Sequence, residues 1–372
     1  MEKNPALLPL AKLFLKLGFT AFGGPAAHIA MLHQEVVTKR KWLDEQHFLD
    51  LIGATNLIPG PNSTEMVMHV GQERAGWKGL VVAGLCFILP AVCITGILAW
   101  LYQKYGALPE VLPFIYGIKP TVIAVIVAAI YPLAKKSLKS VGLAAIGIVV
   151  LVLSLLGYNE IFLMFAAGFL AMLWHYFNKN GSATVLFPLL LIEIQQPEVT
   201  TNWKLFFIFL KIGAILYGSG YVLFAFLDAE LVSTGLLSRE QLIDAIAVGQ
   251  FTPGPVFSAV TFVGYQINGA SGALVATVAV FLPSFFFVAL LNPMVKKMRN
   301  SVLFGVFLDA VNMASIAIIL AVCIEMSKTT VTDWRMLLIA ISSLVLLFRF
   351  PSINSAFIVL GGAVAGYLLL LL

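Results

Sequence analysis

The sequence has 372 residues, of which 60% are hydrophobic and 11% charged, and its mean hydropathy is +0.97. Soluble domains are nearer about half apolar and about a quarter charged, so this composition predicts an integral membrane protein. At roughly 20 residues per crossing, about ten to twelve crossings or half-crossings fit, which excludes a peripheral protein, a single-span receptor and a nucleic-acid binder. The net charge of +5 is expected to come mainly from cytoplasmic loops.

Apolar stretches that end at charged or turn residues predict about ten membrane-spanning helices. The expected spans are 10–32, 79–102, 112–133, 141–157, 160–177, 204–226, 271–291, 302–326, 335–349 and 353–371. Two further apolar stretches, 46–71 and 240–268, are divided by Pro59-Gly60-Pro61 and Pro253-Gly254-Pro255. Each is predicted to be a broken, re-entrant hairpin, because proline removes a backbone donor and glycine lets the chain reverse. The expected fold class is therefore an all-α, polytopic membrane protein.

The two halves of the chain are similar in sequence. The segment FLKLG at 14–18 recurs as FLKIG at 209–213, and the two Pro-Gly-Pro motifs follow at nearly the same offset. Chance similarity between apolar segments would not place successive matches at a nearly constant distance along the chain. The chain is therefore predicted to be a tandem duplication, with a first repeat at 1–177, a connecting cytoplasmic segment at 178–202 and a second repeat at 203–372.

The second repeat is predicted to be inverted relative to the first, because an odd number of crossings in each half turns the second half upside down. Loop charge supports the inversion: the loop 33–45 is basic, whereas its equivalent 227–240 is mainly acidic. The basic loops are expected on the cytoplasmic side. Both termini are then outside, unless Gly23-Gly24-Pro25 makes 10–32 re-entrant, which would place the N-terminus in the cytoplasm.

Four breaks at symmetric positions are predicted to meet and bind the substrate. They are Gly23-Gly24-Pro25, Pro59-Gly60-Pro61, Gly218-Ser219-Gly220 and Pro253-Gly254-Pro255. A helix that begins in mid-membrane presents free N–H groups and a partial positive charge, which suit an anion. Polar side chains beside the breaks offer hydrogen bonds to an oxyanion: Thr55, Asn56, Asn62, Ser63, Thr64, Gln250, Thr252, Ser258 and Thr261. The alternatives are ordinary packed kinks, and small polar residues that only aid helix packing.

Three lysines lie well inside predicted spans, where a charge costs at least about 2.5 kcal/mol. Lys16 and Lys211 are equivalent in the two repeats, whereas Lys119 aligns with Asn312. Together the three could neutralise a divalent anion, so they are candidate substrate-binding residues. The alternative is that each ammonium group reaches the membrane surface along its own side chain.

Glu65 and His69 are candidates for proton coupling, because Glu65 follows the first break by one turn and the second repeat has no acid there. Glu65 could instead only pair with a basic residue. Asp50 and Asp244, in the helices that lead into the breaks, are expected to bond to other helices. The three cysteines form no CxxC or Cys/His cluster of metal-ligand spacing, and neither a metal nor a cofactor is predicted.

These motifs resemble those of the chromate ion transporter family over nearly the whole chain. The matching segments are FLKLGFTAFGGPAAHIAML at 14–32, Lys41-Trp42-Leu43 and LIPGPNS at 57–63, with the weaker second copies FLKIGAILYGSGYV and FTPGPVFSAVTFVGY. The family's motif residues correspond to Gly23, Gly24, Pro25, Pro59, Gly60, Pro61, Asn62, Pro253, Gly254 and Pro255. Gly218-Ser219-Gly220 departs from the first repeat's Gly-Gly-Pro, which leaves open whether both halves contact substrate equally.

The resemblance implies a two-domain transporter of the bacterial inner membrane that exports chromate with the proton-motive force and gives chromate resistance. Sulfate, a dianion of nearly the same size, is a related substrate. The expected partners are chromate or sulfate, protons and the lipid bilayer, and a homodimer is left open.

Two alternatives keep the anion pathway: a passive channel, or an uptake transporter for sulfate or another anion. A third hypothesis, an intramembrane enzyme using His28, Glu65 and His69, is disfavoured because the sequence has no HExxH or nucleophile motif. The protein is therefore predicted not to be an enzyme.

Overall fold

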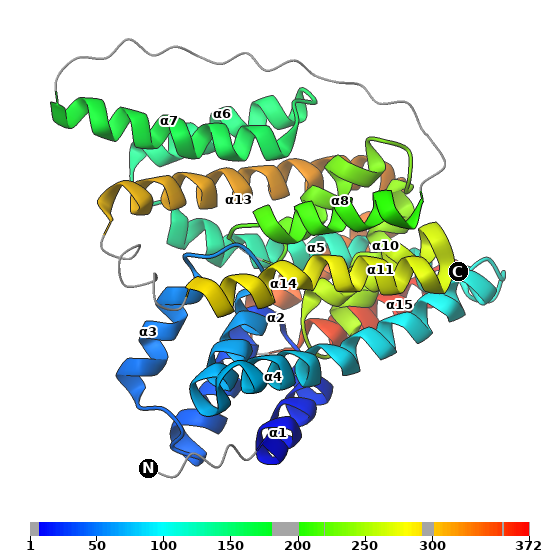
Figure 1. Ribbon diagram of the computed structural model, residues 1–372. Coiled ribbons are helices and arrows are strands. Elements are labelled where there is room, and N and C mark those ends of the chain that lie inside the picture. Colours follow the sequence, from blue (N-terminus) through cyan, green and yellow to red (C-terminus); the bar gives the residue numbers. More distant parts are fainter. Residues whose placement is uncertain (1–6, 181–200, 219, 292–300, 352, 372) are drawn as a thin grey trace.

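The computed structural model describes residues 7–180, 201–218, 220–291, 301–351 and 353–371. Within these ranges every regular element is a helix, which confirms the predicted all-α fold (Figure 1). The first half contains α1 (Leu7–Thr20), α2 (Gly24–His33), the π-helix η1 (Gln34–Lys39), α3 (Glu45–Thr55), α4 (Asn62–Tyr105), α5 (Leu112–Ser137), α6 (Val141–Leu155) and α7 (Glu160–Asn180). The second half contains α8 (Asn202–Ile215), α9 (Val222–Leu227), the π-helix η2 (Asp228–Val232), α10 (Arg239–Phe251), the 3-10 helix η3 (Val256–Ser258), α11 (Ala259–Leu291), α13 (Val302–Thr330), α14 (Trp334–Arg349) and α15 (Ser355–Leu371).

The helices have the length and surface of membrane spans. In the described part of the chain, α4, α5, α7, α11 and α13 are long and apolar enough to cross a bilayer, and α6 and α15 are shorter apolar helices. Large apolar side chains on their outer faces are exposed, among them Trp100, Phe286 and Leu360. Such a surface suits hydrocarbon and would be a liability in water. The chain is a multi-pass membrane protein.

Two of the predicted continuous spans, 10–32 and 204–226, are instead broken hairpins, so those two predictions are wrong. The first is interrupted between α1 and α2, where Gly23 and Gly24 have φ of 101° and 78°. The second is interrupted between α8 and α9, where Gly218 has φ of 102°. A positive φ ends a right-handed helix, and glycine adopts it without steric cost. The alternative that 10–32 is re-entrant is therefore the correct one.

The two Pro-Gly-Pro segments form the breaks that the sequence predicts. The first lies between α3 and α4 and the second between α10 and η3, with φ of 138° at Gly60 and 90° at Gly254. Beyond each break the helix runs for about three turns and then reverses at Ala75–Gly76 in α4 and Asn268–Gly269 in α11. The two reversals have nearly the same dihedral angles, with φ of 61° and 60° at the glycines. This match extends the duplication from sequence to backbone.

Contacts between the repeats show that they are inverted. Asp309, near the start of α13, contacts Lys139, which lies just before α6. Met313, one turn further along α13, lies against Gly147 within α6. α13 and α6 therefore run in the same direction. α5 is joined to α6 by a short turn and runs the opposite way (Figure 1). α13 is the equivalent of α5, since Lys119 aligns with Asn312. The equivalent helices are therefore antiparallel, as the predicted inversion requires.

The bundle has two distinct ends, both visible in Figure 1. We call the left side the basic end, because α5 finishes there with Lys135 and Lys136 and the loop before α3 carries Arg40. α7 finishes at the basic end, whereas α8 begins at the opposite end, where Asn202 bonds to Asn268 at 3.0 Å. Most of the predicted cytoplasmic connection at 178–202 lies outside the described residues. The connection therefore joins two helix ends, the end of α7 and the start of α8, that lie at opposite ends of the bundle.

Candidate functional site

The four breaks meet between the two repeats, as the sequence predicts. The backbone N–H of Gly60 donates to the carbonyl of Leu216 at 2.8 Å, and that of Gly254 donates to Ala21 at 2.8 Å. Each Pro-Gly-Pro turn is thus bonded to the chain just before the break of the other repeat. These paired bonds satisfy backbone groups that the interrupted helices would otherwise leave exposed at membrane depth.

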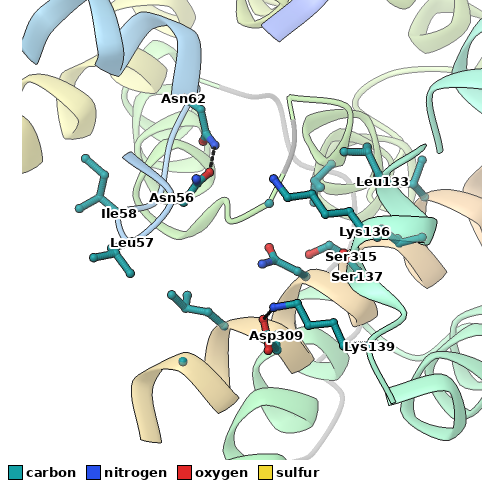
Figure 2. A pocket seen from close by; sticks show the side chains of 17 residues that line it. Asn56, Leu57, Ile58, Asn62, Leu133, Lys136, Ser137, Lys139, Asp309 and Ser315 are labelled. Atoms are coloured by element: carbon teal, nitrogen blue, oxygen red, sulfur yellow. Dashed lines mark hydrogen bonds and ion pairs between the residues drawn. The ribbon is translucent and has the colours of Figure 1, made fainter. Parts of the chain in front are cut away.

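A cavity of about 320 Å³ leads from the basic end to two of these breaks (Figure 2). One wall includes Asn56 and Asn62 on the two sides of the first Pro-Gly-Pro, and Gly218 of the break between α8 and α9. Other lining residues come from the last turn of α5, the turn before α6 and the first half of α13. A water occupies about 30 Å³, so the cavity has room for a small oxyanion together with bound water.

Polar side chains from both repeats face this space. Asn62 Nδ2 donates to Asn56 Oδ1 at 2.8 Å, and Asn312 and Ser315 line the wall from α13. Lys136 and Lys139 project into it, and Lys139 Nζ is 2.7 Å from Asp309 Oδ1 (Figure 2). Amide N–H groups, a hydroxyl and two ammonium groups give the cavity donors for an anion with several acceptor oxygens.

The opposite end of the bundle is held together by polar contacts between the repeats. Tyr102 of α4 donates to the buried carboxylate of Asp244 on α10 at 2.6 Å, and Lys119 of α5 lies 3.5 Å from Glu240. Tyr102 also stacks edge-on against Phe262 of α11. The prediction that Asp244 bonds to another helix is confirmed. Asp50 accepts a hydrogen bond from Gln46 of the same helix, and its bond to another helix stays a prediction. α4, α5, α10 and α11 are thereby tied together at that end.

Of the predicted substrate-binding side chains, only Asn56 and Asn62 line the cavity. Pro59, Gly60 and Pro61, and likewise Pro253, Gly254 and Pro255, shape the turns that position their neighbours. Gly24 faces the Tyr221 hydroxyl, and Pro25 lies beside Gly220. Gly23, Gly24 and Pro25 therefore contribute to the meeting of the breaks and not to the wall.

Most of the small polar side chains are engaged in internal hydrogen bonds. Thr55 donates to the carbonyl of Ile52, and Ser63 pairs with His28 at 3.2 Å. Near the second break, Thr95 donates toward both Thr252 and Ser258, at 3.3 and 3.4 Å. Thr261 pairs with Thr277 at 2.7 Å, and Gln250 accepts from Ser355 at 3.4 Å. For these residues the helix-packing alternative describes the structure better than substrate contact.

The three predicted lysines lie away from the cavity. Lys16 is 3.8 Å from Glu35, and Lys211 forms the equivalent ion pair with Glu230, at 2.5 Å. Both ammonium-bearing side chains are about half exposed or more, at 62% and 49%. Each pair joins the two arms of a broken hairpin, so these lysines have a local role in each repeat. Lys119, as described above, belongs to the opposite end.

Glu65 and His69 are buried between the repeats, with exposed fractions of 0% and 1%. The Glu65 carboxylate lies against Gly60 and beside the Ser284 hydroxyl of α11. Among the described residues, the two ring nitrogens of His69 have no hydrogen-bond partner, and the Thr64 hydroxyl has none either. Buried polar groups are usually paired, so this cluster is an uncommon feature next to the first break.

Sequence reasoning missed Lys136, Lys139 and Ser315 as lining residues, and it singled out Asp309 only as a titratable group inside a predicted span. Lys136 and Lys139 were visible only as loop charge, and nothing in the sequence places a loop beside a break. The sequence did draw attention to Asn312, because the alignment of the two repeats pairs it with Lys119, a predicted substrate-binding residue. Among the described residues, no group of three His, Cys, Asp or Glu side chains is arranged to hold a metal ion.

Comparison with known proteins agrees with the duplicated fold. The model of the chromate transporter family matches residues 8–172 and again residues 203–367. The chain belongs to the chromate transporter family. The two matches coincide with the two inverted repeats, so the family model matches each repeat separately.

The relatives include proteins of about the same length as this chain and proteins of about half its length. The chromate transport protein of Cupriavidus metallidurans is 30% identical over 370 residues, covering 97% of this chain and 92% of the relative. The probable chromate transport protein of Synechococcus elongatus is 28% identical and covers 93% of this chain and 91% of the relative. The uncharacterized transporter YwrA of Bacillus subtilis is 23% identical over 158 residues, 41% of this chain but 89% of its own length. No solved structure gives a significant match.

Proposed function

We propose that the protein exports chromate across the bacterial inner membrane by alternating access, and that the cavity at the basic end binds the anion. The observation that carries this proposal is the cavity itself, which joins two lysines and three asparagines to the meeting point of the broken helices. The names of the long relatives supply the substrate, chromate. Sulfate has similar shape and charge and is the second substrate to test.

The direction of transport follows from the orientation that the loop charges favour. Basic loops remain in the cytoplasm during membrane insertion, so the basic end faces the cytoplasm in our proposal. The cavity then receives chromate from inside the cell. For release, the contacts of Tyr102 with Asp244 and of Lys119 with Glu240 must separate while the basic end closes. The inverted repeats supply two related arrangements for such an exchange.

Proton coupling is assigned to Glu65 with His69 beside it. A carboxyl group buried without a charged partner is more stable when it is protonated, so it can carry a proton when its surroundings change between two states. Glu65 lies against the Gly60 turn, where a movement of the first hairpin would alter its environment. This position links a proton site to the turn that also holds Asn56 and Asn62.

The test is uptake of labelled chromate into inside-out membrane vesicles, with and without a proton gradient. We expect gradient-dependent accumulation in the wild type. Lys136→Gln should reduce it about tenfold, because a charged hydrogen-bond donor to the anion is lost. Lys135→Gln is the matched control, since this neighbouring lysine does not line the cavity. Equal uptake by both variants would contradict the assignment of the cavity.

A passive anion channel is the second candidate, because the same broken helices could line a continuous pore. A channel would equilibrate chromate but never concentrate it, and collapse of the gradient would leave its initial rate unchanged. An uptake transporter would accumulate the anion in right-side-out vesicles instead. The same set of vesicles therefore separates the three possibilities.

A further inference from the structure

One residue of the cavity has the wrong charge for a general anion site. Asp309 lies in the second turn of α13, among the lysines and amides that line the wall (Figure 2). Its side chain is 36% exposed, so it faces the open space of the cavity and is not held inside the bundle. Only Lys139, among the described residues, bonds to it, and that bond is to Oδ1. The second carboxylate oxygen, Oδ2, remains available to a ligand.

The charges around the cavity favour a monoanion. The charged residues that line it are Lys136, Lys139 and Asp309, which together carry two positive charges and one negative charge. A singly charged ligand makes this set neutral. A dianion leaves one negative charge uncompensated in a partly enclosed site, where charge is costly.

Hydrogen bonding leads to the same preference. An ionised carboxylate only accepts hydrogen bonds, and so do all the oxygens of a fully ionised oxyanion such as sulfate. Two acceptors placed side by side repel each other, and the repulsion discriminates against that ligand. An oxyanion that keeps one proton has an O–H group, which can donate to Asp309 while its other oxygens accept from Lys136, Lys139 and Asn312.

We propose that Asp309 makes the cavity selective for singly protonated oxyanions, with hydrogen chromate as the bound form of the substrate. This inference rests on the proposed function and specifies its ligand. Hydrogen chromate is present near neutral pH, whereas sulfate carries no proton there. The carboxylate thus separates two anions that shape alone cannot distinguish.

The experiment is equilibrium binding of chromate to the purified protein in lipid nanodiscs, at several pH values and with sulfate as competitor. For the wild type, chromate affinity should fall as pH rises and the protonated form of the anion is depleted. Sulfate should compete at least about tenfold less well than chromate. In Asp309→Asn, sulfate should compete about tenfold better than in the wild type, because an amide can donate to it. Asp309→Glu should retain the wild-type preference.

Each outcome decides a separate point. Equal competition by sulfate and chromate in the wild type would overturn the selectivity, and so would an Asp309→Asn variant with an unchanged ratio. If Asp309→Asn strengthens the binding of both anions equally, Asp309 acts only as a repulsive charge, and the inference is also wrong. If the folded wild type binds neither anion, the proposed function itself fails. The wild-type measurements stand even if the asparagine variant does not fold.

Discussion

The basic end and the opposite end of the bundle are built by equivalent helices, yet one is open and the other is tied together. At the basic end, Asn312 of α13 lines a cavity, whereas its equivalent Lys119 of α5 pairs with Glu240 at the opposite end. The repeats share breaks, reversals and reciprocal backbone bonds, so the scaffold does not cause the difference. Side chains at a few equivalent positions do. A duplicated membrane fold can thus present two unlike faces from one architecture.

The largest effect is expected from the scaffold that both ends share. A β-carbon on Gly60 would approach Glu65 Oε1 to 2.2 Å, and its φ of 138° is one that other residues rarely adopt. Gly60→Val should therefore abolish chromate transport and lower the yield of folded protein. Gly53→Ala, in α3 with nothing within 4 Å of the added carbon, should keep wild-type activity. Transport by the Gly60 variant would mean that the turn is not needed.

The next effect concerns the proposed proton site at Glu65, which has no acidic equivalent in the second repeat. In Glu65→Gln, chromate should still exchange across the membrane, but a proton gradient should no longer drive accumulation, because the amide cannot release a proton. Counterflow of labelled chromate against unlabelled chromate, with no gradient imposed, serves as the control. Gradient-driven accumulation at the wild-type level would exclude Glu65 as the coupling group.

Weakening the opposite end should shift the balance between the two ends. Tyr102→Phe removes the 2.6 Å bond to Asp244 and leaves a buried carboxylate without that donor, at a cost of about 1–3 kcal/mol. The state that is open at the basic end should become less populated. We expect slower labelling of a cysteine placed at Asn312 by a membrane-impermeant maleimide. An unchanged labelling rate would mean that this bond does not hold the opposite end closed.

The smallest effect is expected from Lys16 and Lys211. Each forms an ion pair that is partly exposed, and such pairs contribute at most about 1 kcal/mol. Lys16→Gln and Lys211→Gln should therefore change chromate affinity by less than about fivefold. A loss as large as that of Lys136→Gln would restore the role that the sequence suggested for them.

The sequence predicted the fold well, because its strongest signals are local. The duplicated Pro-Gly-Pro motifs and the basic loops were enough for the inverted repeats and for the hairpins at 46–71 and 240–268. The spans 10–32 and 204–226 were misread, because hydropathy does not register a change of φ at Gly23 or Gly218.

The candidate site was predicted only in part, for reasons of packing. Asn56 and Asn62 adjoin a break along the chain and were found, whereas Lys136, Lys139 and Asp309 reach it only through contacts between distant segments. Lys16, Lys119 and Lys211 were chosen for their place in apolar runs. Their acidic partners, Glu35, Glu240 and Glu230, lie far enough away in sequence that only the folded structure pairs them.

The most direct test of the central claim uses a single cysteine at Asn312 in a protein whose natural cysteines are replaced. A membrane-impermeant maleimide is added to inside-out and to right-side-out vesicles, with and without chromate. We predict labelling in inside-out vesicles, where the basic end faces the reagent, and protection from labelling by chromate. Labelling only in right-side-out vesicles, or no protection by chromate at any concentration, would contradict a cytoplasmic anion cavity.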